Sequence, residues 1–364
     1  MNNQEINSTP TIKKESKNKI RVDFERSPLK ERLKTKFLSL FFVKKVVWYL
    51  FRLILLIGIA YIVLYPFITK IAGSFMSPED FVDATVRLIP RNFTFDTYIA
   101  IFNELNYVEA FINTFMLSAS TALIQTFVCC MVGYGLAKFK FKGRKIVFLA
   151  VIFSLIVPHR TLQFAMFRLF SQFDLFGIFS FLSGNAHTGI GWIDGILQSI
   201  HILPIEGGSF NLLNTFWPLI ILSISGLAFK NGLYIFLLRQ FFNGVPDELE
   251  ESAYIDGSGT LKTFISIILP LSIPMMITVF LFAFCWQWTD NFYVSTFFTD
   301  SGPTVMTSIV NIPPSLKTSY AGQNIYYSAI RNTAGLMIIA PLIVLYLFCQ
   351  KFLVQGIERS GIVG

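Results

Sequence analysis

The sequence predicts an all-α membrane protein with six transmembrane helices. Of its 364 residues, 53% are hydrophobic and only 14% are charged, which is more apolar than a soluble domain. The long apolar runs show no alternation with period two, so they predict helices that cross the bilayer rather than strands of a barrel. The net charge of +8 does not indicate nucleic-acid binding, because Lys and Arg gather in the N-terminal tail and in loops beside the spans.

Residues 1–45 are predicted to form a cytoplasmic basic tail that ends in a short interfacial helix. The tail is rich in Lys and Glu and lacks apolar periodicity until Phe37, which favours disorder. Basic residues such as Lys13 and Arg21 occupy the region where the apolar core of a cleavable signal peptide would lie, so no signal peptide is expected. Attraction of the tail to anionic membrane lipid is a secondary expectation.

Residues 46–364 are predicted to form one six-span domain. The first span covers residues 46–71, and the acidic loop that follows it is placed outside the cell. The second span, residues 111–137, runs into a basic turn at residues 138–145. The positive-inside rule assigns this turn to the cytoplasm.

The third span is expected to be a kinked helix. Its apolar run begins at Ile146 and reaches only Val157 before Pro158 interrupts it, which is too short to cross about 30 Å of hydrocarbon. The helix is therefore extended to Phe170, with Pro158 as the kink.

A polar, glycine-rich segment, residues 183–214, is predicted to be an insertion on the outer face. Spans four, five and six are placed at residues 216–238, 274–297 and 334–352. Residues 245–272 then form a cytoplasmic loop between spans four and five, so both ends of the chain are expected in the cytoplasm.

The cytoplasmic loop is predicted to contain a short acidic helix over residues 246–256. Pro246 suits a first helical position, and the acids of the first turns are favoured there by the helix dipole. Leu249 and Ala253 lie four residues apart and predict an apolar face. Gly257 is expected to end the helix.

Pro270 and Pro274 are expected to bend the chain from this loop into span five. Composition alone leaves two interpretations of the loop open. It could be a solvated connector, or a rigid element that transmits force to a cytoplasmic partner.

The spacing of residues in this loop resembles that of permease subunits of bacterial ATP-binding-cassette importers. The family pattern E-A-A-x3-G-x9-I-x-L-P is matched from Glu251 onward, with Ser252 in place of the middle Ala. The version with Asp256 before Gly257 looks like the carbohydrate branch, and in particular the smaller maltose-type permease subunit. Three further stretches resemble that subunit, at residues 137–144, 288–292 and 350–364. The basic tail and the 183–214 insertion depart from it.

The resemblance implies a permease that forms half of an alternating-access path for an oligosaccharide or glycoside. It implies three partners in the bacterial cytoplasmic membrane system: a second permease subunit in a heterodimer, a dimer of ATPase subunits and an extracellular solute-binding protein. The chain itself is not expected to be an enzyme or to hold a cofactor, since ATP and Mg would bind to the partner ATPase. The resemblance assigns ATPase contact to Glu250, Glu251, Ser252, Ala253, Asp256 and Gly257 in a coupling helix, and to Gly361, Ile362, Val363 and Gly364 in the tail.

Polar and aromatic residues of spans three and five are candidates for the path of the solute. His159 and Arg160 follow the proline, where an ionisable side chain often marks a path or gate, although pairing within the bundle or reaching the interface fits equally. In span five, indoles that stack on sugar rings are one interpretation, and an aromatic belt with polar packing groups is the favoured one. The candidates in span five are Trp286, Gln287, Trp288, Asp290 and Asn291.

Other site types are not indicated. The segment at residues 257–263 lacks the Gly-Lys pair of a phosphate-binding loop, and the three histidines (His159, His187, His201) are too scattered to suggest a metal site. The four cysteines lie in apolar runs and suggest neither zinc nor disulfides. The alternatives that stay open are the same architecture importing another solute, such as a glycerol phosphodiester, and a non-transport membrane scaffold.

Overall fold

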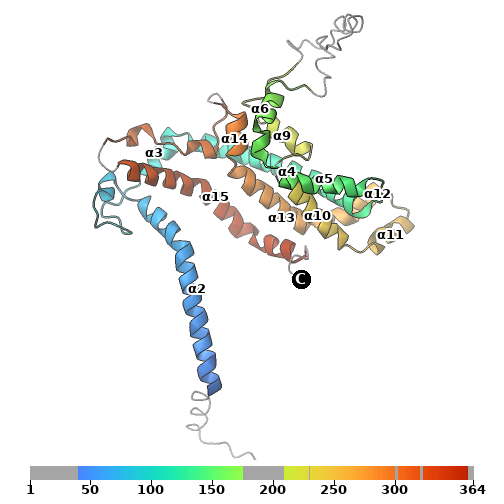
Figure 1. Cartoon of the computed structure of the whole chain (residues 1–364), viewed down its shortest axis with the longest axis horizontal. Helices are drawn as coiled ribbons and strands as arrows, with labels where there is room; N and C mark the ends of the chain where they lie inside the picture. The colour runs from blue at the N-terminus through green and yellow to red at the C-terminus, as the bar shows by residue number, and fades with distance from the viewer. Residues whose placement is uncertain (1–39, 175–208, 229, 300–301, 320–322, 360–364) are drawn as a thin grey trace, which may run out of the picture. The chain divides into compact units, whose positions relative to one another are not determined.

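The computed structural model describes residues 40–174, 209–228, 230–299, 302–319 and 323–359. It divides into two units, residues 1–66 and 67–364, and each unit is described by itself. Within the described residues the regular structure is helical (Figure 1), and β-structure is limited to two isolated bridges, Met76 with Phe93 and Phe173 with Phe210. The predicted all-α class is confirmed.

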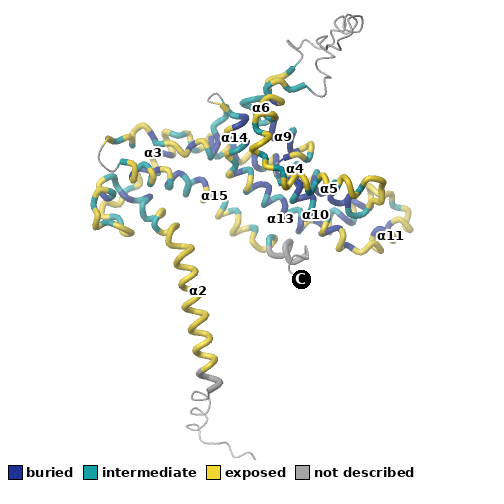
Figure 2. The backbone as a smooth tube through the Cα atoms, in the orientation of Figure 1, coloured by how far each residue is buried: buried dark blue, intermediate teal, exposed yellow. Residues whose placement is uncertain are grey.

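The described part of the first unit is a single helix, α2 (Leu40–Gly73), which continues into the second unit. Its large apolar side chains from residue 46 to residue 65 are exposed all around the helix (Figure 2). A helix that is apolar on every face is typical of a segment in contact with lipid or with neighbouring membrane helices. This helix lies where the first span is predicted.

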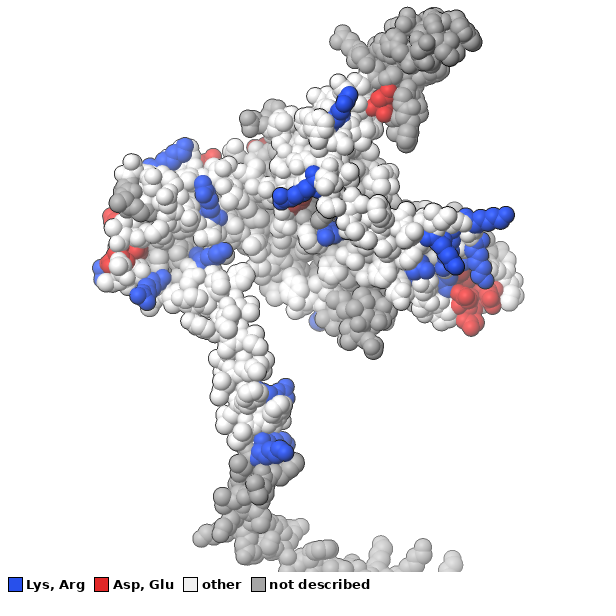
Figure 3. All heavy atoms as spheres, in the orientation of Figure 1, with Lys and Arg blue, Asp and Glu red and all other residues white. Residues whose placement is uncertain are grey.

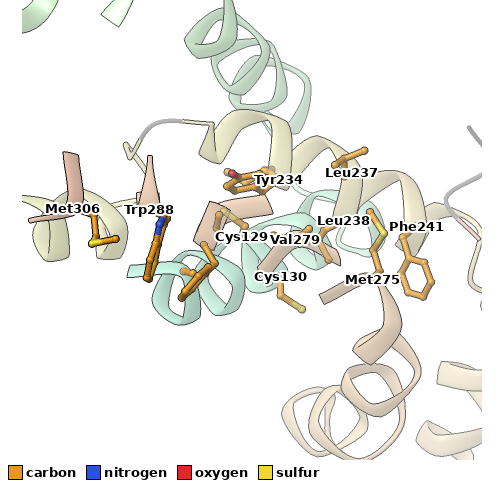
Figure 4. Close-up of a cluster of buried hydrophobic side chains, with 14 of the residues drawn as sticks. Cys129, Cys130, Tyr234, Leu237, Leu238, Phe241, Met275, Val279, Trp288 and Met306 are labelled. Atoms are coloured by element: carbon orange, nitrogen blue, oxygen red, sulfur yellow. The ribbon is translucent and has the colours of Figure 1, made fainter. Parts of the chain in front are cut away.

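Helix α4 (Tyr107–Lys138) is the centre of the second unit. It packs against α9 (Trp217–Ile224), α10 (Asn231–Asn243) and α13 (Leu269–Trp288), and α13 packs in turn on α15 (Gln323–Arg359). Figure 4 shows side chains of α4, α10 and α13 that gather in one buried apolar core, among them Cys129, Tyr234 and Val279.

Two glycines allow the backbones on either side of α10 to approach closely. A Cβ atom on Gly133 of α4 would lie 3.0 Å from the Leu238 Cβ of α10. A Cβ atom on Gly232 of α10 would lie 2.9 Å from the Val151 carbonyl oxygen of α5 (Arg144–Ile156). Small residues at such crossings are the usual way in which membrane helices pack tightly, so α10 is held between α4 and α5.

Short segments gather at the N-terminal end of α4. The Met306 amide donates a hydrogen bond to Thr114 Oγ1 at 2.8 Å, and Asn113 Nδ2 donates to the Thr304 carbonyl oxygen at 2.9 Å. The Ser315 amide donates to Glu104 Oε2 at 3.0 Å. The first two bonds tie the segment before α15 to the start of α4, and the third ties it to Glu104, which precedes α4. The elements of this region are η1 (Pro78–Phe81), α3 (Asp96–Glu104), α14 (Phe292–Phe297), η5 (Met306–Ile309) and η6 (Pro314–Leu316).

Four helices in the described residues are long and apolar enough to cross a membrane, and a fifth is counted if one bent pair forms a single span. The four overlap predicted spans one, two, five and six, but the helix at span five starts at Thr260 rather than Pro274 and ends at Trp288 rather than Phe297. Their bounds are Lys44–Gly73, Tyr107–Lys138, Thr260–Trp288 and Gln323–Leu353.

The third span is broken rather than kinked. Helix α5 ends at Ile156, a turn of 3-10 helix covers His159–Leu162, and α6 (Gln163–Ser171) follows at an angle of 93°. The prediction of one continuing helix is therefore wrong. Pro158 has no N–H and disfavours helical geometry in the residue before it, and Val157 is accordingly extended, with ψ of 120°.

The fourth span, predicted as one helix over residues 216–238, is also broken, and that prediction is wrong too. Helix α9 ends at Ile224, where Gly226 has φ of 75° and the Leu227 amide donates to the Leu222 carbonyl oxygen at 3.1 Å. This arrangement is a glycine cap that terminates a helix. Helix α10 starts again only after Lys230, which also has a positive φ.

No break accompanies the prolines at the start of span five, where the sequence predicts a bend. Thr260–Thr263 (α12), a π-helical turn at Phe264–Ile268 and α13 form one continuous membrane-length helix. A proline ring clashes with the carbonyl group four residues before it. The wider π-turn directly before Pro270 provides the local adjustment that accommodates this ring.

Candidate functional site

Helix α11 (Glu248–Ile255) lies where the coupling helix is predicted. Its C-terminal end is a glycine cap in which the Ser258 amide donates to the Ala253 carbonyl oxygen at 2.9 Å and the Gly257 amide donates to that of Tyr254 at 3.0 Å. Gly257 has φ of 79°, and a Cβ atom there would meet nothing within 4 Å. Glycine is therefore required for its backbone conformation and not for space.

The buried side of α11 differs from the predicted one. Glu250 and Ala253 are buried, whereas Leu249 is exposed, so the predicted apolar face of Leu249 and Ala253 is wrong. An eight-residue helix buries too little surface to orient itself by its own pattern, and its attachments at both ends decide which side turns inward. The Oε1 atom of Glu250 is buried, and the Glu250 side chain interacts with that of Tyr134 on α4.

The outward side of α11 mixes acids with apolar groups. Glu251, Ser252 and Asp256 are exposed, and Ile255 is 86% exposed, as is 68% of Leu261 at the start of the next helix. Exposed apolar groups surrounded by polar ones are typical of a surface that binds a partner. The C-terminal tail residues 361–364, the other predicted ATPase contact, lie outside the described residues.

Lys138, the last residue of α4, fastens the start of α11. Its Nζ donates to the Val245 carbonyl oxygen at 2.6 Å and to Asp247 Oδ1 at 2.5 Å. The lysine side chain is only 7% exposed, whereas that of Asp247 is 76% exposed. The hydrogen bond and the charge of Lys138 hold the pKa of Asp247 below its ordinary value of 3.8, so the carboxylate at this helix start is charged at neutral pH.

The C-terminal end of α4 is surrounded by positive charge. Arg144 Nη2 donates to the Ala137 carbonyl oxygen at 3.1 Å, and Arg239 Nε donates to that of Leu136 at 3.3 Å. Cations are favoured at this end of a helix by its dipole. Figure 3 shows Lys and Arg side chains gathered beside a smaller group of acidic ones in the region of α11. A surface hollow here is lined by Lys140, Lys142, Arg144, Lys145 and Arg239 among others.

Replacing Lys138 with methionine should loosen α11 more than replacing Asp247 with asparagine. The methionine leaves the Val245 carbonyl oxygen without its charged donor, and a hydrogen bond to a charged group is worth about 1.5–3 kcal/mol. Asp247 is exposed, so its loss should have the smaller effect. Amide hydrogen exchange across residues 248–258 measures the difference, and equal protection in the two variants would contradict the anchoring role of Lys138.

The contact between Lys138 and Asp247 should also depend on pH in one direction. The pKa of Asp247 is lowered in the folded protein, so the stabilisation is complete above the ordinary pKa and is lost as the pH falls through the folded value. The protection of the α11 amides against hydrogen exchange, relative to an unfolded peptide at the same pH, should therefore not depend on Asp247 near neutral pH. It should fall only in acid, below about pH 4.

Polar side chains from several helices line a narrow cavity near the middle of α4. Three of the predicted solute-path residues, Trp286, Gln287 and Asp290, line it. It is completed by residues of α4, α9, α10 and α14, including Gln125, Ser223, Tyr234 and Tyr293. The structure thus brings part of the predicted set together with residues that the sequence analysis did not select.

Two groups in this cavity are fixed by hydrogen bonds and one is not. Gln125 Nε2 donates to Ser223 Oγ at 3.3 Å. Asp290 accepts bonds from the amides of Phe292 at 3.2 Å and Tyr293 at 3.0 Å, so it caps the start of α14. The Nε2 atom of Gln287 is buried and has no hydrogen-bond partner among the described residues.

Trp288 and Asn291 lie apart from this cavity. Trp288 is 1% exposed and its Nε1 donates to the Ile338 carbonyl oxygen of α15 at 2.9 Å, so it belongs to the packed core. Its ring lies edge-on to that of Phe111 on α4. Asn291 is exposed just before α14.

His159 and Arg160 lie in the turn between α5 and α6. His159 lines a second cavity, between this turn and the break that separates α9 from α10, whereas Arg160 is exposed and lines neither cavity. Lys230, which lies in the α9–α10 break, also lines the second cavity. Its Nζ lies 4.7 Å from the centre of the Trp286 ring, so Lys230 joins the second cavity to a residue of the first.

Lys230 is not among the residues predicted for the solute path, although the sequence marks it. It is the sole charged residue between Thr215 and Leu238, inside the predicted fourth span. An ionisable residue within a span is by default a candidate for function. No comparable signal marks Gln125 or Ser223, because their positions opposite each other arise from the packing of α9 on α4.

Comparisons with known proteins agree with this architecture. Residues 130–359 match the family described as binding-protein-dependent transport system inner membrane component. The chain is 25% identical to the probable ABC transporter permease protein YurM of Bacillus subtilis, over 87% of this chain and 88% of that protein. It is also 25% identical to the galactooligosaccharides transport system permease protein GanQ of the same species, over 88% of this chain and 98% of that protein.

A solved structure shares the fold. It is a bacterial alginate ABC transporter in complex with an alginate pentasaccharide-bound periplasmic protein, with a TM-score of 0.54 and 18% sequence identity over 88% of this chain and 98% of that chain. The resemblance predicted from the loop at residues 245–272 is confirmed. The chain belongs to the family of inner membrane components of binding-protein-dependent transport systems.

Proposed function

We propose that this chain is the permease subunit of an ATP-driven carbohydrate importer and forms half of an alternating-access path. The observation that carries the proposal is the arrangement of α4. Lys138 at its C-terminal end holds α11, a capped helix with an exposed outer side, while Gln125 in its interior lines a cavity with indole and polar groups. Such a helix is suited to transmit the movement of an ATPase to a path for solute.

The proposed assembly contains a second permease subunit, two ATPase subunits and an external solute-binding protein. ATP and Mg bind to the ATPase subunits. The contact with the ATPase involves Glu251, Ser252, Asp256 and the exposed Ile255, with Gly257 fixing the end of the helix, and residues 361–364 add a second contact. Glu250 and Ala253 face inward and orient the helix rather than touch the partner.

The chain crosses the bacterial cytoplasmic membrane six times, with both termini in the cytoplasm. In this proposal the bent pair α5 and α6 and the interrupted pair α9 and α10 supply spans three and four. Broken helices occur at membrane depth where they line a cavity or are buried in protein, and both breaks flank the cavity that contains His159 and Lys230. Residues 1–45 form the cytoplasmic tail and residues 183–214 an outer insertion. The coupling loop, predicted over residues 245–272, is reduced to residues 245–259, because the membrane-length helix already starts at Thr260.

A carbohydrate is the favoured solute because the exposed indole of Trp286 and the hydrogen-bonding groups beside it suit a sugar; the cavity that they line holds about 10 Å³ here and would have to widen to admit one. Trp286 can stack on a sugar ring, and Gln287 has an unused donor. The names of the relative GanQ and of the alginate transporter give saccharides as their solutes. A glycerol phosphodiester remains the alternative solute, and a non-transport scaffold is the alternative of another class.

The test is to purify the chain with its co-expressed partners and to reconstitute it in proteoliposomes. An ATPase should co-purify, and uptake of the saccharide that the external protein binds should require ATP. Uptake by the chain alone without ATP, or purification without an ATPase, would contradict the proposal. Screening the external protein against saccharides and glycerol phosphodiesters distinguishes the two solute classes.

A further inference from the structure

We propose that the basic hollow beside the C-terminal end of α4 binds an anionic phospholipid, with the phosphate among its Lys and Arg side chains and the acyl chains along α5. Lipid binding of this kind requires only that the chain spans a membrane, so it does not depend on which solute the importer carries. Four features of the described residues indicate it: the size of the hollow, the charges that line it, the fixed positions of two guanidinium groups and the apolar face of α5.

The hollow has room for a lipid headgroup and is lined by charge of one sign. Its volume is about 730 Å³, and it is formed by the turn between α4 and α5 together with Arg239 near the end of α10. No acidic residue lines it in the described part of the chain. The positive-inside rule explains cations in a cytoplasmic turn, but it does not explain why they converge on one hollow. The basic residues of the turn that line it are Lys140, Lys142, Arg144 and Lys145.

The end of α4 fixes two of the cations in place. Arg144 Nη2 donates to the Ala137 carbonyl oxygen at 3.1 Å, and Arg239 Nε donates to that of Leu136 at 3.3 Å. The two guanidinium groups lie within electrostatic reach of each other, so their like charges repel. A guanidinium group has five N–H donors in a plane that suits phosphate. Both groups can therefore also bind an anion, which would offset the repulsion.

The lysines of the hollow are available to a ligand. Lys140, Lys142 and Lys145 are exposed, and none of the three forms an ion pair with another described residue. Asp247 lies within electrostatic reach of Lys140 but is already bonded to Lys138. Exposed lysines around two fixed guanidinium groups provide the positive potential that attracts an anionic headgroup.

An exposed apolar face of α5 starts inside the hollow. Ile146 lines the hollow, and three further exposed side chains follow it at intervals of three, four and three residues, which places all four on one side of the helix. Phe148 and Val151, on the opposite side, pack against the core. The exposed fractions are 73% for Ile146, 67% for Leu149, 63% for Phe153 and 71% for Ile156.

The length of this face matches one leaflet of a bilayer. From Ile146 to Ile156 it spans ten residues, or about 15 Å at 1.5 Å per residue, which is half of a hydrocarbon core of about 30 Å. A phosphate in the hollow would thus have its acyl chains beside apolar side chains over their whole depth. An acidic protein surface could satisfy the charges of the hollow, but a soluble ATPase would not reach along a membrane span, so the apolar face favours a lipid.

The experiment measures lipid binding to the full-length chain in detergent by native mass spectrometry. Phosphatidylglycerol and phosphatidylcholine are added in equal amounts, and wild type should bind phosphatidylglycerol in preference. Lys142→Gln combined with Lys145→Gln should lower the affinity for phosphatidylglycerol about 25-fold, because each basic group near an anionic lipid contributes about fivefold. Lys142→Arg combined with Lys145→Arg keeps both charges and should retain most of the binding.

A matched control removes the same charge elsewhere. Lys262 and Lys351 are exposed and do not line the hollow, so Lys262→Gln combined with Lys351→Gln should bind lipid as wild type does. Equal losses in the two glutamine pairs, or equal binding of both lipids by wild type, would show that the hollow is not a specific site. The elution volume reports folding, and if a double variant aggregates, each single variant should still lose about fivefold.

Two further outcomes would overturn the assignment to a lipid. Glycerophosphoglycerol has the headgroup of phosphatidylglycerol without its acyl chains, and it should not compete at the same concentration. Equal competition would mean that the face of α5 contributes nothing. If Lys142→Gln with Lys145→Gln leaves lipid binding unchanged but prevents co-purification of the ATPase, the hollow is part of the ATPase contact. Either result leaves the importer proposal standing, because that proposal is tested by ATP-dependent uptake.

Discussion

Replacing Gly257 with valine should lower ATP-dependent uptake roughly 5–30-fold while the external protein binds solute as before. Gly257 has φ of 79°, and a β-branched residue in this region is destabilised by about 1–2 kcal/mol, which corresponds to that factor in an equilibrium. The cap of α11 then frays. A helix of eight residues has little else to hold its last turn, so fewer molecules present the ordered docking surface. Uptake by proteoliposomes is the measurement.

Gly259 supplies a matched control. It lies two residues after Gly257 with an ordinary extended backbone, φ of −77° and ψ of 162°, and a Cβ atom there would also meet nothing within 4 Å. Gly259→Val should therefore keep most of the uptake. Gly257→Asn should lie between the two, because asparagine tolerates the left-handed region better than other residues. Equal loss in both valine variants would show that the positive φ is not the cause.

Replacing Gly232 with alanine should destabilise the bundle by about 1–3 kcal/mol, the usual effect of overpacking. The new Cβ would lie 2.7 Å from Ser154 Oγ and 2.9 Å from the Val151 carbonyl oxygen. The hydroxyl is a small group, but the carbonyl belongs to the α5 backbone, so α5 and α10 would have to move apart. Thermal denaturation of the detergent-solubilised importer, followed by the loss of monodisperse protein, measures the effect.

Two further variants test the cause of this effect. Gly335 lies in the interior of α15 with open space around its Cβ position, so Gly335→Ala should instead stabilise by about 0.5–1 kcal/mol through helix propensity. Ser154→Ala combined with Gly232→Ala should recover only part of the loss, because it removes the hydroxyl contact and leaves that with the carbonyl. Full recovery, or destabilisation by Gly335→Ala, would contradict the packing explanation.

Composition and apolar run length were sufficient to predict where the long helices lie. Predicted spans one, two, five and six each overlap a membrane-length helix, because a run of apolar residues in a bilayer has few alternatives to helix. The bounds of span five were placed too late in the chain, since the helix already starts at Thr260. The loop between spans four and five was predicted from glycine and acid placement, and the glycine cap at Gly257 follows directly from its need for positive φ. These features depend on local chemistry.

The breaks in spans three and four were not predicted, because they depend on what surrounds them. Pro158 was expected to kink a helix, yet the chain turns by 93° there. Gly226 and Lys230 interrupt a run that is apolar enough to continue, and both adopt positive φ. The backbone groups released at such a break need protein or water around them, and the neighbours that meet this need come from distant parts of the chain.

The inward side of α11 was not predicted either, because it also depends on residues that are distant in the chain. Spacing favoured Leu249 with Ala253, but the structure buries Glu250 with Ala253. Lys138 anchors Val245 and Asp247 at the start of the helix, and it is 107 residues or more away from both in the chain. No local pattern carries that information.

The length and the attachments of helix α4 bear on how a movement of α11 would affect the rest of the subunit. It is uninterrupted over 32 residues, about 48 Å at 1.5 Å per residue. At one end it is bonded to Thr304 and Met306, and at the other to Val245. Because α4 has no break and is hydrogen-bonded near both ends, it is expected to move as one rigid body. In the proposed importer, the two interrupted helix pairs beside α4 are the places that can bend, so a small tilt imposed at α11 would change the separation across the cavity rather than be absorbed within α4.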